Sequence, residues 1–154
     1  MHTPTLGYED DTQITKSEIA RVQLTEAIAL FLEEKFLCSI TLAGAAEEVF
    51  ARLLNAHGEE SVVEDSFKSI QKLREATSFS AMKNHTKNEI FKHWNIARNA
   101  IKHHNKDEEE TVTINLFDEA YWMIKRGIAN ASKLDITIHN ESDFENWCIV
   151  KIHL

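Results

Sequence analysis

The sequence predicts an all-α protein, an up-and-down bundle of about five helices with a small irregular or two-stranded appendage at its C-terminal end. Glycine and proline are scarce, with four and one among 154 residues, whereas an all-β chain needs many turns. Apolar residues recur at the helical spacings of three and four along runs rich in Ala, Leu, Ile, Glu and Lys. With 43% apolar and 27% charged residues, the chain has the composition of one globular domain.

Two helices are expected early in the chain, after a loose polar arm over residues 1–14. Thr15 followed by Glu18 has capping-box spacing and opens a helix that runs to about Phe36. The second helix, residues 39–56, has the clearest pattern, and Glu47 falls off its apolar stripe. That stripe contains Leu42, Ala45, Ala46, Val49, Phe50, Leu53 and Leu54.

Three further helices complete the predicted bundle, which spans residues 15–132. The third covers about 62–76 and is followed by a loop over 77–85. Thr86 with Glu89 is a second capping box and starts the fourth helix, and Asn115 with Asp118 caps the fifth. The pieces 111–114 and 135–139 could pair as two short strands. Residues 133–154 form the appendage, which ends in a short helix or strand.

Composition restricts the class of function. A formal net charge of −8 argues against binding to DNA or to other long nucleic acid unless basic groups are locally focused. Five basic residues in and just after the fourth helix and in the fifth could provide such a focus: Lys92, Lys102, Lys106, Lys125 and Arg126. No apolar run reaches the roughly 18 residues of a membrane span, and the first residues do not resemble a signal peptide. With two distant cysteines read as reduced thiols, we expect a cytoplasmic protein.

One short stretch carries the residue types of a phosphodiester-cleaving site. Arg98, Asn99 and His103 lie close together near the end of the fourth helix. Arginine is a permanent cation whose forked donors fit phosphate oxygens, and histidine exchanges a proton near neutral pH. An asparagine can orient either group. These three residues are therefore the candidate catalytic set.

A helical wheel divides the fourth helix into two faces. The core stripe contains Ile90, Trp94, Ala97 and Ile101, and the second contains Ile96, Asn99, Ala100 and His103. The second stripe fits a helix-to-helix contact or a cleft wall, and equally a solvated face with two tolerated apolar residues. Arg98 and His103 are about 140° apart around an ideal helix. They would meet at one phosphate if the helix bends, if the guanidinium swings round, or, most naturally, if two chains share the site.

The order Arg98-Asn99, three residues, then His103 resembles the signature of the HEPN superfamily (higher eukaryotes and prokaryotes nucleotide-binding). In that signature a histidine follows the arginine by about four to six residues, often with a polar residue directly after the arginine. Both His103 and His104 satisfy the spacing, so either is the motif histidine. The motif ends a late helix of a short bundle, as in that family, and the run LAGAAEE at 42–48 is similar to the second helix of small bacterial members.

The resemblance covers about residues 15–132 and implies a homodimer through the helix that carries residues 90–104. Such proteins act as endoribonucleases without metal or other cofactor, in defence or toxin systems, with a protein antitoxin or regulator as partner. His103 would move the proton of the ribose 2′-hydroxyl or of the leaving oxygen, leaving a cyclic phosphate. Arg98 would stabilise charge on the phosphate, and Asn99 would orient substrate or histidine.

One departure from the family concerns the branch that a nucleotidyltransferase partner modifies. Its members carry a tyrosine two residues after the histidine, whereas this chain has Asn105 or Lys106 there. The departure argues against that mode of neutralisation.

Other interpretations of the same residues stay open. Arg98 and His103 also fit a solvated pair near a helix C-terminus, where cations interact favourably with the dipole. Many HEPN-like domains have lost catalysis, so the alternative function is an inactive helical module that binds a partner protein or a nucleotide. The histidines show no ligand spacing, so no metal site is predicted. Aromatic residues such as Trp122 are assigned to the core, and the acidic run 107–110 is expected to lie away from any cleft because it would repel RNA.

Overall fold

The computed structural model describes residues 6–76 and 85–152, and every regular element in these ranges is a helix. The all-α prediction is confirmed. The elements are α1 (Lys16–Leu32), α2 (Phe36–Ala56), α3 (Val62–Ala76), α4 (Lys87–Trp94), α5 (Ile96–Lys102), α6 (Leu116–Lys133) and α7 (Glu141–Ile152). The expected strand pieces, 111–114 and 135–139, are irregular, so the two-stranded alternative is wrong. The loop expected over 77–85 lies almost entirely outside the described residues.

The predicted helix starts rest on side-chain caps that the structure contains. Thr15 Oγ1 accepts a hydrogen bond from the Glu18 N–H at 3.1 Å, and Asn115 Oδ1 accepts one from the Asp118 N–H at 3.1 Å. Thr86 and Glu89 form the full reciprocal box, because the Glu89 carboxylate also accepts the Thr86 N–H at 2.7 Å. Each cap satisfies a backbone donor that would otherwise lack a partner at the helix N-terminus.

The first helix is shorter than expected. It ends at Leu32 because Glu34 adopts a left-handed conformation with φ of 60°, and the Lys35 N–H then bonds back to the Leu30 carbonyl at 2.8 Å. This turn is usually made by glycine, so the sequence contains no clear stop signal there. Phe36, the expected end of the first helix, is instead the first residue of α2.

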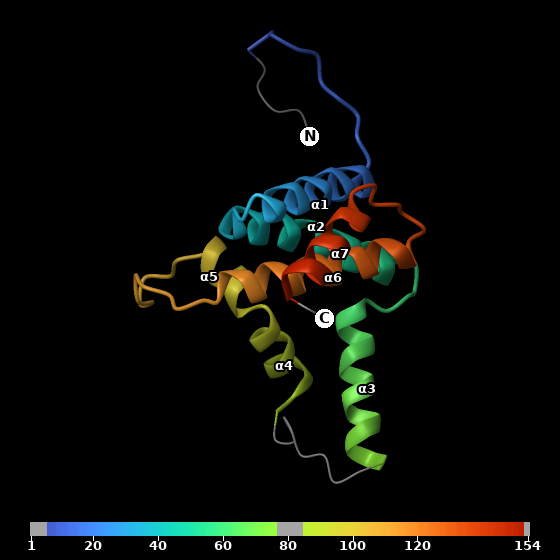
Figure 1. The fold of residues 1–154 in the computed structure, drawn as a ribbon, viewed down its shortest axis with the longest axis vertical. Helices are drawn as coiled ribbons and strands as arrows, with labels where there is room; N and C mark the ends of the chain where they lie inside the picture. The colour runs from blue at the N-terminus through green and yellow to red at the C-terminus, as the bar shows by residue number, and fades with distance from the viewer. Residues whose placement is uncertain (1–5, 77–84, 153–154) are drawn as a thin grey trace.

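The core lies where α1, α2, α6 and α7 pack against one another (Figure 1). The Phe31 ring of α1 is fully buried, and its centroid lies 5.2 Å from that of Phe36 and 5.1 Å from that of Phe144. Phe144 and Cys148 bring α7 into the same core, with 0% and 3% exposure. The C-terminal segment, predicted as an appendage, therefore supplies core side chains. Trp122 was assigned to the core, but it is 60% exposed.

The buried face of α2 is rotated relative to the predicted stripe. Leu42 and Leu53 lie at its edges, half-buried, whereas Gly44 and Glu47 are buried. The reason is that α2 is covered on two sides, by α1 and α6, with α5 against a third part of its surface. A stripe drawn only through the apolar residues at one helical spacing misses the contact that α5 makes.

The helices α3 and α4 extend away from the four-helix core (Figure 1). They contact each other through Phe67 and Phe91, whose ring centroids are 6.0 Å apart, and through a Lys87–Glu64 ion pair at 3.6 Å. From the far end of this arm, α4 leads the chain back toward the core, where α5 begins.

Candidate functional site

The predicted fourth helix is divided at Asn95 into α4 and α5, which corrects the expected continuous helix from Thr86 to the motif histidines. The Asn95 side chain donates to the Phe91 carbonyl at 2.8 Å, and the Arg126 guanidinium donates to the Trp94 carbonyl at 3.2 Å. Asparagine side chains compete with the backbone for helix hydrogen bonds, so Asn95 is a natural point for the break. The break allows α5 to lie against α2 while α4 extends outward.

The helix α5 has the two faces that the wheel predicts. Ala97 is 3% exposed and Ile101 packs against the core, whereas Ile96 is 52% exposed. Asn99 and His103 are exposed as well. The His103 N–H still bonds to the Asn99 carbonyl at 3.0 Å, so the last helical bond of α5 fixes these two residues relative to each other.

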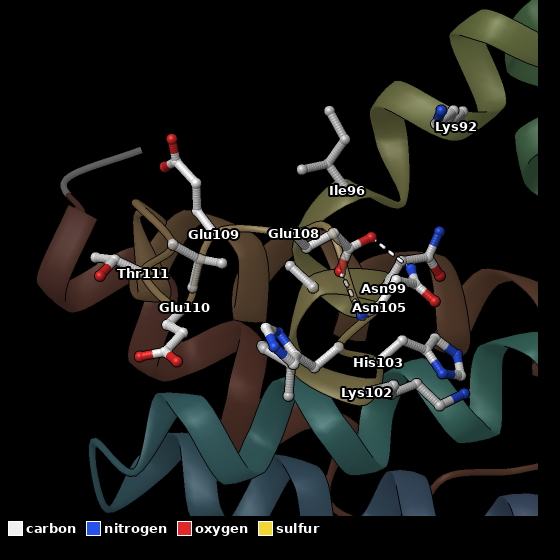
Figure 2. Close-up of a pocket in the computed structure, with 14 residues that line it drawn as sticks. Lys92, Ile96, Asn99, Lys102, His103, Asn105, Glu108, Glu109, Glu110 and Thr111 are labelled. Atoms are coloured by element: carbon white, nitrogen blue, oxygen red, sulfur yellow. Dashed lines mark hydrogen bonds between the residues drawn. The ribbon is translucent and has the colours of Figure 1, made fainter.

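An open cleft of about 1220 Å³ lies over the exposed face of α5 and under the loop that follows it (Figure 2). Asn99 and His103 both line it, as predicted for a cleft wall. The other lining residues are Lys92, Ile96, Ala100, Ile101, Lys102, His104, Asn105, Glu108, Glu109, Glu110, Thr111 and Val112. Arg98 does not line the cleft, so the structure brings together two of the three candidate catalytic residues.

Arg98 is turned toward α2 instead. Its Nη1 atom lies 3.2 Å from Glu47 Oε2, and only 14% of its side chain is exposed. The aliphatic part of Arg98 crosses Gly44, where an added Cβ would lie 2.8 Å from both Cγ and Cδ. Glycine at this position makes room for the arginine, and the glutamate one turn further along the helix receives its charge.

Glu47 is the buried centre of a polar junction that joins four helices. Its side chain is 5% exposed, and its second oxygen accepts a hydrogen bond from Asn130 Nδ2 at 3.5 Å. The Asn130 oxygen in turn accepts the Val62 N–H at 2.8 Å, at the start of α3. Arg98 is therefore tied through Glu47 to α2, α3 and α6. The sequence contained one signal for this junction. Gly44 and Glu47 lie three residues apart on one face of α2, and the other residues of that face are mostly apolar.

The neighbouring Glu48 lies close to three cationic side chains at the edge of the cleft. Its carboxylate lies 2.9 Å from Arg52 Nη2, 3.6 Å from Lys102 Nζ and 3.9 Å from Arg98 Nη1. The hydrogen bond from Arg52, together with the charges of Arg98 and Lys102, holds the pKa of Glu48 below its usual range. Lys102 is thus anchored at the base of the cleft that it lines.

The positive charge is more narrowly focused than predicted. Lys92 and Lys102 line the cleft. Lys125 pairs with Glu145 at 2.7 Å, and Arg126 is enclosed beside Trp94 and Met123. Burial lowers the pKa of the Arg126 guanidinium, and the charge of Glu47 opposes that effect. These two residues therefore stabilise the fold and lie outside the cleft.

Three of the four residues of the acidic run line the cleft, which contradicts the expectation that the run lies away from it. Glu108, Glu109 and Glu110 are lining residues on the wall opposite α5 (Figure 2). The Glu108 carboxylate accepts the Asn105 N–H at 3.1 Å, and the Glu108 N–H donates to the Asn105 carbonyl at 3.0 Å. The hydrogen bonds from Asn105 and, to a lesser degree, the neighbouring histidines hold the pKa of Glu108 below its usual range. Because this turn follows α5 directly, it places the three glutamates at the same cleft as the histidines.

No family model, curated protein or solved structure matches the chain. The HEPN resemblance therefore rests on the motif at 98–103 and on its place in the bundle. Across the helices that the structure describes, none combines the length and apolar character needed to cross a membrane.

Proposed function

We propose that this protein is a HEPN-like, metal-independent endoribonuclease that acts as a homodimer. The observation that carries the proposal is the shared placement of Asn99 and His103 on one exposed wall of an open cleft, with Lys92 and Lys102 beside them. Two lysines attract a phosphodiester, an amide can hold one of its oxygens, and an imidazole can move a proton within the same space. Lys102 directly precedes His103 in the chain, and Lys92 lies seven residues before Asn99.

The proposed reaction is an internal transfer at phosphorus. The His103 imidazole accepts the proton of the ribose 2′-hydroxyl while the 2′ oxygen attacks phosphorus, and the bond from phosphorus to the 5′ oxygen breaks. The departing oxygen takes a proton from a second, protonated imidazole, which the partner subunit's His103 supplies in a two-chain site. The products are a 2′,3′-cyclic phosphate and a 5′-hydroxyl, with no change of oxidation state. Lys102 offsets the charge that builds on the phosphate oxygens.

The proposed dimer forms through the segment carrying residues 90–104. Ile96 is 52% exposed and Val112 is 53% exposed, and both border the cleft. A two-fold axis beside them would cover both side chains and bring two copies of Asn99 and His103 to one substrate strand. In this arrangement Arg98 is a positioning residue, because its guanidinium is engaged by Glu47 within its own chain.

The test is cleavage of a fluorescently labelled RNA by purified wild type and His103→Ala in the presence of a chelator. We expect the substitution to slow cleavage by about two orders of magnitude or more, because the proton-transfer group is lost. His57→Ala is the matched control, since His57 is an exposed histidine that does not line the cleft. Light scattering should give the mass of a dimer for all three proteins. Equal cleavage by wild type and His103→Ala would refute the assignment.

A second candidate function is a catalytically inactive module that binds a partner protein or a nucleotide. The observation that favours it is the burial of Arg98 against Glu47, which removes the cation that the family resemblance places on the phosphate. On this alternative the wild type does not cleave RNA at all, and it binds RNA or a nucleotide in the same cleft without turnover.

A role in a defence or toxin system, with a protein antitoxin or regulator, belongs to the first candidate. It predicts that expression of the wild type is toxic and that His103→Ala relieves the toxicity.

A further inference from the structure

The cleft has two walls of opposite charge, and this arrangement has a consequence for ligand entry. One wall carries Lys92 and Lys102 with the histidines at the end of α5, and the other carries Glu108, Glu109 and Glu110 (Figure 2). The lining therefore has a net charge of minus one when both histidines are neutral and plus one when both are protonated. The sign of the potential that an RNA strand meets depends on the histidines.

The acidic wall is held in place by the chain itself. Glu108 forms a closed turn with Asn105, with one backbone bond at 3.0 Å and two bonds from Asn105 to the Glu108 carboxylate. Asn105 directly follows the histidines, so the turn fixes where the next two carboxylates begin. Glu109 and Glu110 are exposed, and within residues 6–76 and 85–152 no hydrogen bond or ion pair holds either side chain. Their carboxylates extend away from each other at the edge of the cleft (Figure 2), and neither is neutralised by a fixed partner among the described residues.

The other charges around the histidines do not offset the acidic wall. Lys106 and Asp107 lie next to each other in the same turn and cancel. Under α5, Glu48 is shared among Arg52, Arg98 and Lys102, so it weakens rather than strengthens the positive side. At the far end of the cleft, Lys92 is the only cation that α4 contributes to the lining. The balance is therefore between two lysines, three glutamates and the protonation state of two histidines.

We propose that the segment 108–110 is a built-in competitor for the anion-binding wall, which excludes RNA phosphates from the cleft until His103 and His104 are protonated. The inference rests on the proposed function, because it concerns the entry of RNA into the same cleft. A passive solvated loop would not affect the entry of RNA in this way. Removal of the negative charge of the segment opens the cleft to RNA at alkaline pH, and protonation of the histidines does the same in the unmodified protein.

The experiment measures equilibrium binding of a short, fluorescently labelled 2′-O-methyl oligoribonucleotide, which cannot be cleaved because its 2′ oxygen is blocked. We compare wild type with Glu109→Gln/Glu110→Gln at pH 8 and pH 6 in low salt. Gln keeps the shape of Glu, and Glu108 is left intact so that its turn with Asn105 persists. The matched control is Glu59→Gln/Glu75→Gln, which makes the same change in net charge at exposed positions outside the cleft lining.

We expect Glu109→Gln/Glu110→Gln to bind on the order of tenfold more tightly than wild type at pH 8, while the control changes little, because exposed charges beyond about 10 Å are screened. We also expect wild type to bind on the order of tenfold more tightly at pH 6 than at pH 8, and His103→Gln/His104→Gln to lose most of that difference. Binding of wild type with no gain in Glu109→Gln/Glu110→Gln beyond the control overturns the competitor while leaving an RNA-binding cleft intact. Absence of binding by every variant at both pH values overturns the cleft assignment and the competitor together.

Discussion

Replacement of Arg98 by alanine separates a structural role of this residue from a catalytic one. The change leaves the Glu47 carboxylate, which is 5% exposed, without its cation and removes the aliphatic stem that crosses Gly44. Breaking a buried ion pair by removing one partner costs about 3–5 kcal/mol of unfolding free energy. Arg98 is 14% exposed, so solvent replaces little of the lost interaction, and we expect a loss near 3 kcal/mol, the lower end of that range.

The assay is urea unfolding followed by circular dichroism, with Arg52→Ala as the control. Arg52 also pairs with a glutamate of α2, at 2.9 Å from Glu48, but its side chain is 77% exposed, so its removal should cost less than about 1 kcal/mol. In Arg98→Ala/Glu47→Gln, the carboxylate charge is removed as well, and part of the lost stability should return. A loss for Arg98→Ala no larger than that for Arg52→Ala would refute the reasoning that the Glu47–Arg98 pair holds α5 on α2. The result also decides how a loss of cleavage in Arg98→Ala is interpreted, because an unfolded variant says nothing about catalysis.

Two further predictions concern the fold and its pH dependence. Phe144→Ala should lower the free energy of unfolding by about 3–5 kcal/mol, because the ring is fully buried among the aromatic residues of the core; thermal unfolding near that of wild type would show that α7 is dispensable. The pKa of Glu48 is depressed in the folded state, so its contribution is present above the unfolded value of 4.5 and is lost as the pH falls through the lower folded value. Stability of Glu48→Gln should therefore fall less steeply than that of wild type below pH 4.5, and parallel acid limbs in urea unfolding would contradict this.

The two candidate functions differ in what they require of the cleft. Cleavage needs His103 to reach a ribose and a second imidazole to reach the leaving oxygen, which the proposed dimer provides. Binding alone needs the lysines, Asn99 and the charge of the histidines, but no proton transfer. His103→Ala therefore slows cleavage strongly on the first candidate, whereas on the second it alters affinity at most.

Local sequence patterns determined the helices and most of their starts. The caps at Thr15, Thr86 and Asn115 are confirmed because a cap depends on a side chain and on backbone groups only three residues away. Apolar periodicity likewise identified the exposed face of α5 with Asn99 and His103. Helix ends were less predictable where Glu34 and Asp135 take the left-handed conformation that glycine usually adopts.

Tertiary structure alone decided which of these residues meet. Arg98 bonds to Glu47 across 51 positions of sequence, and Asn130 bonds to the same carboxylate across 83. The acidic run returns to the histidine wall because of a turn at Asn105, although its composition suggested a solvated loop distant from any anion site. Spacing along the chain fixes which side chains share a helix face, but the partner of that face is set by how separate helices pack. The sequence therefore determined the helical scaffold and the candidate residues, and packing divided them between a buried ion pair and an open cleft.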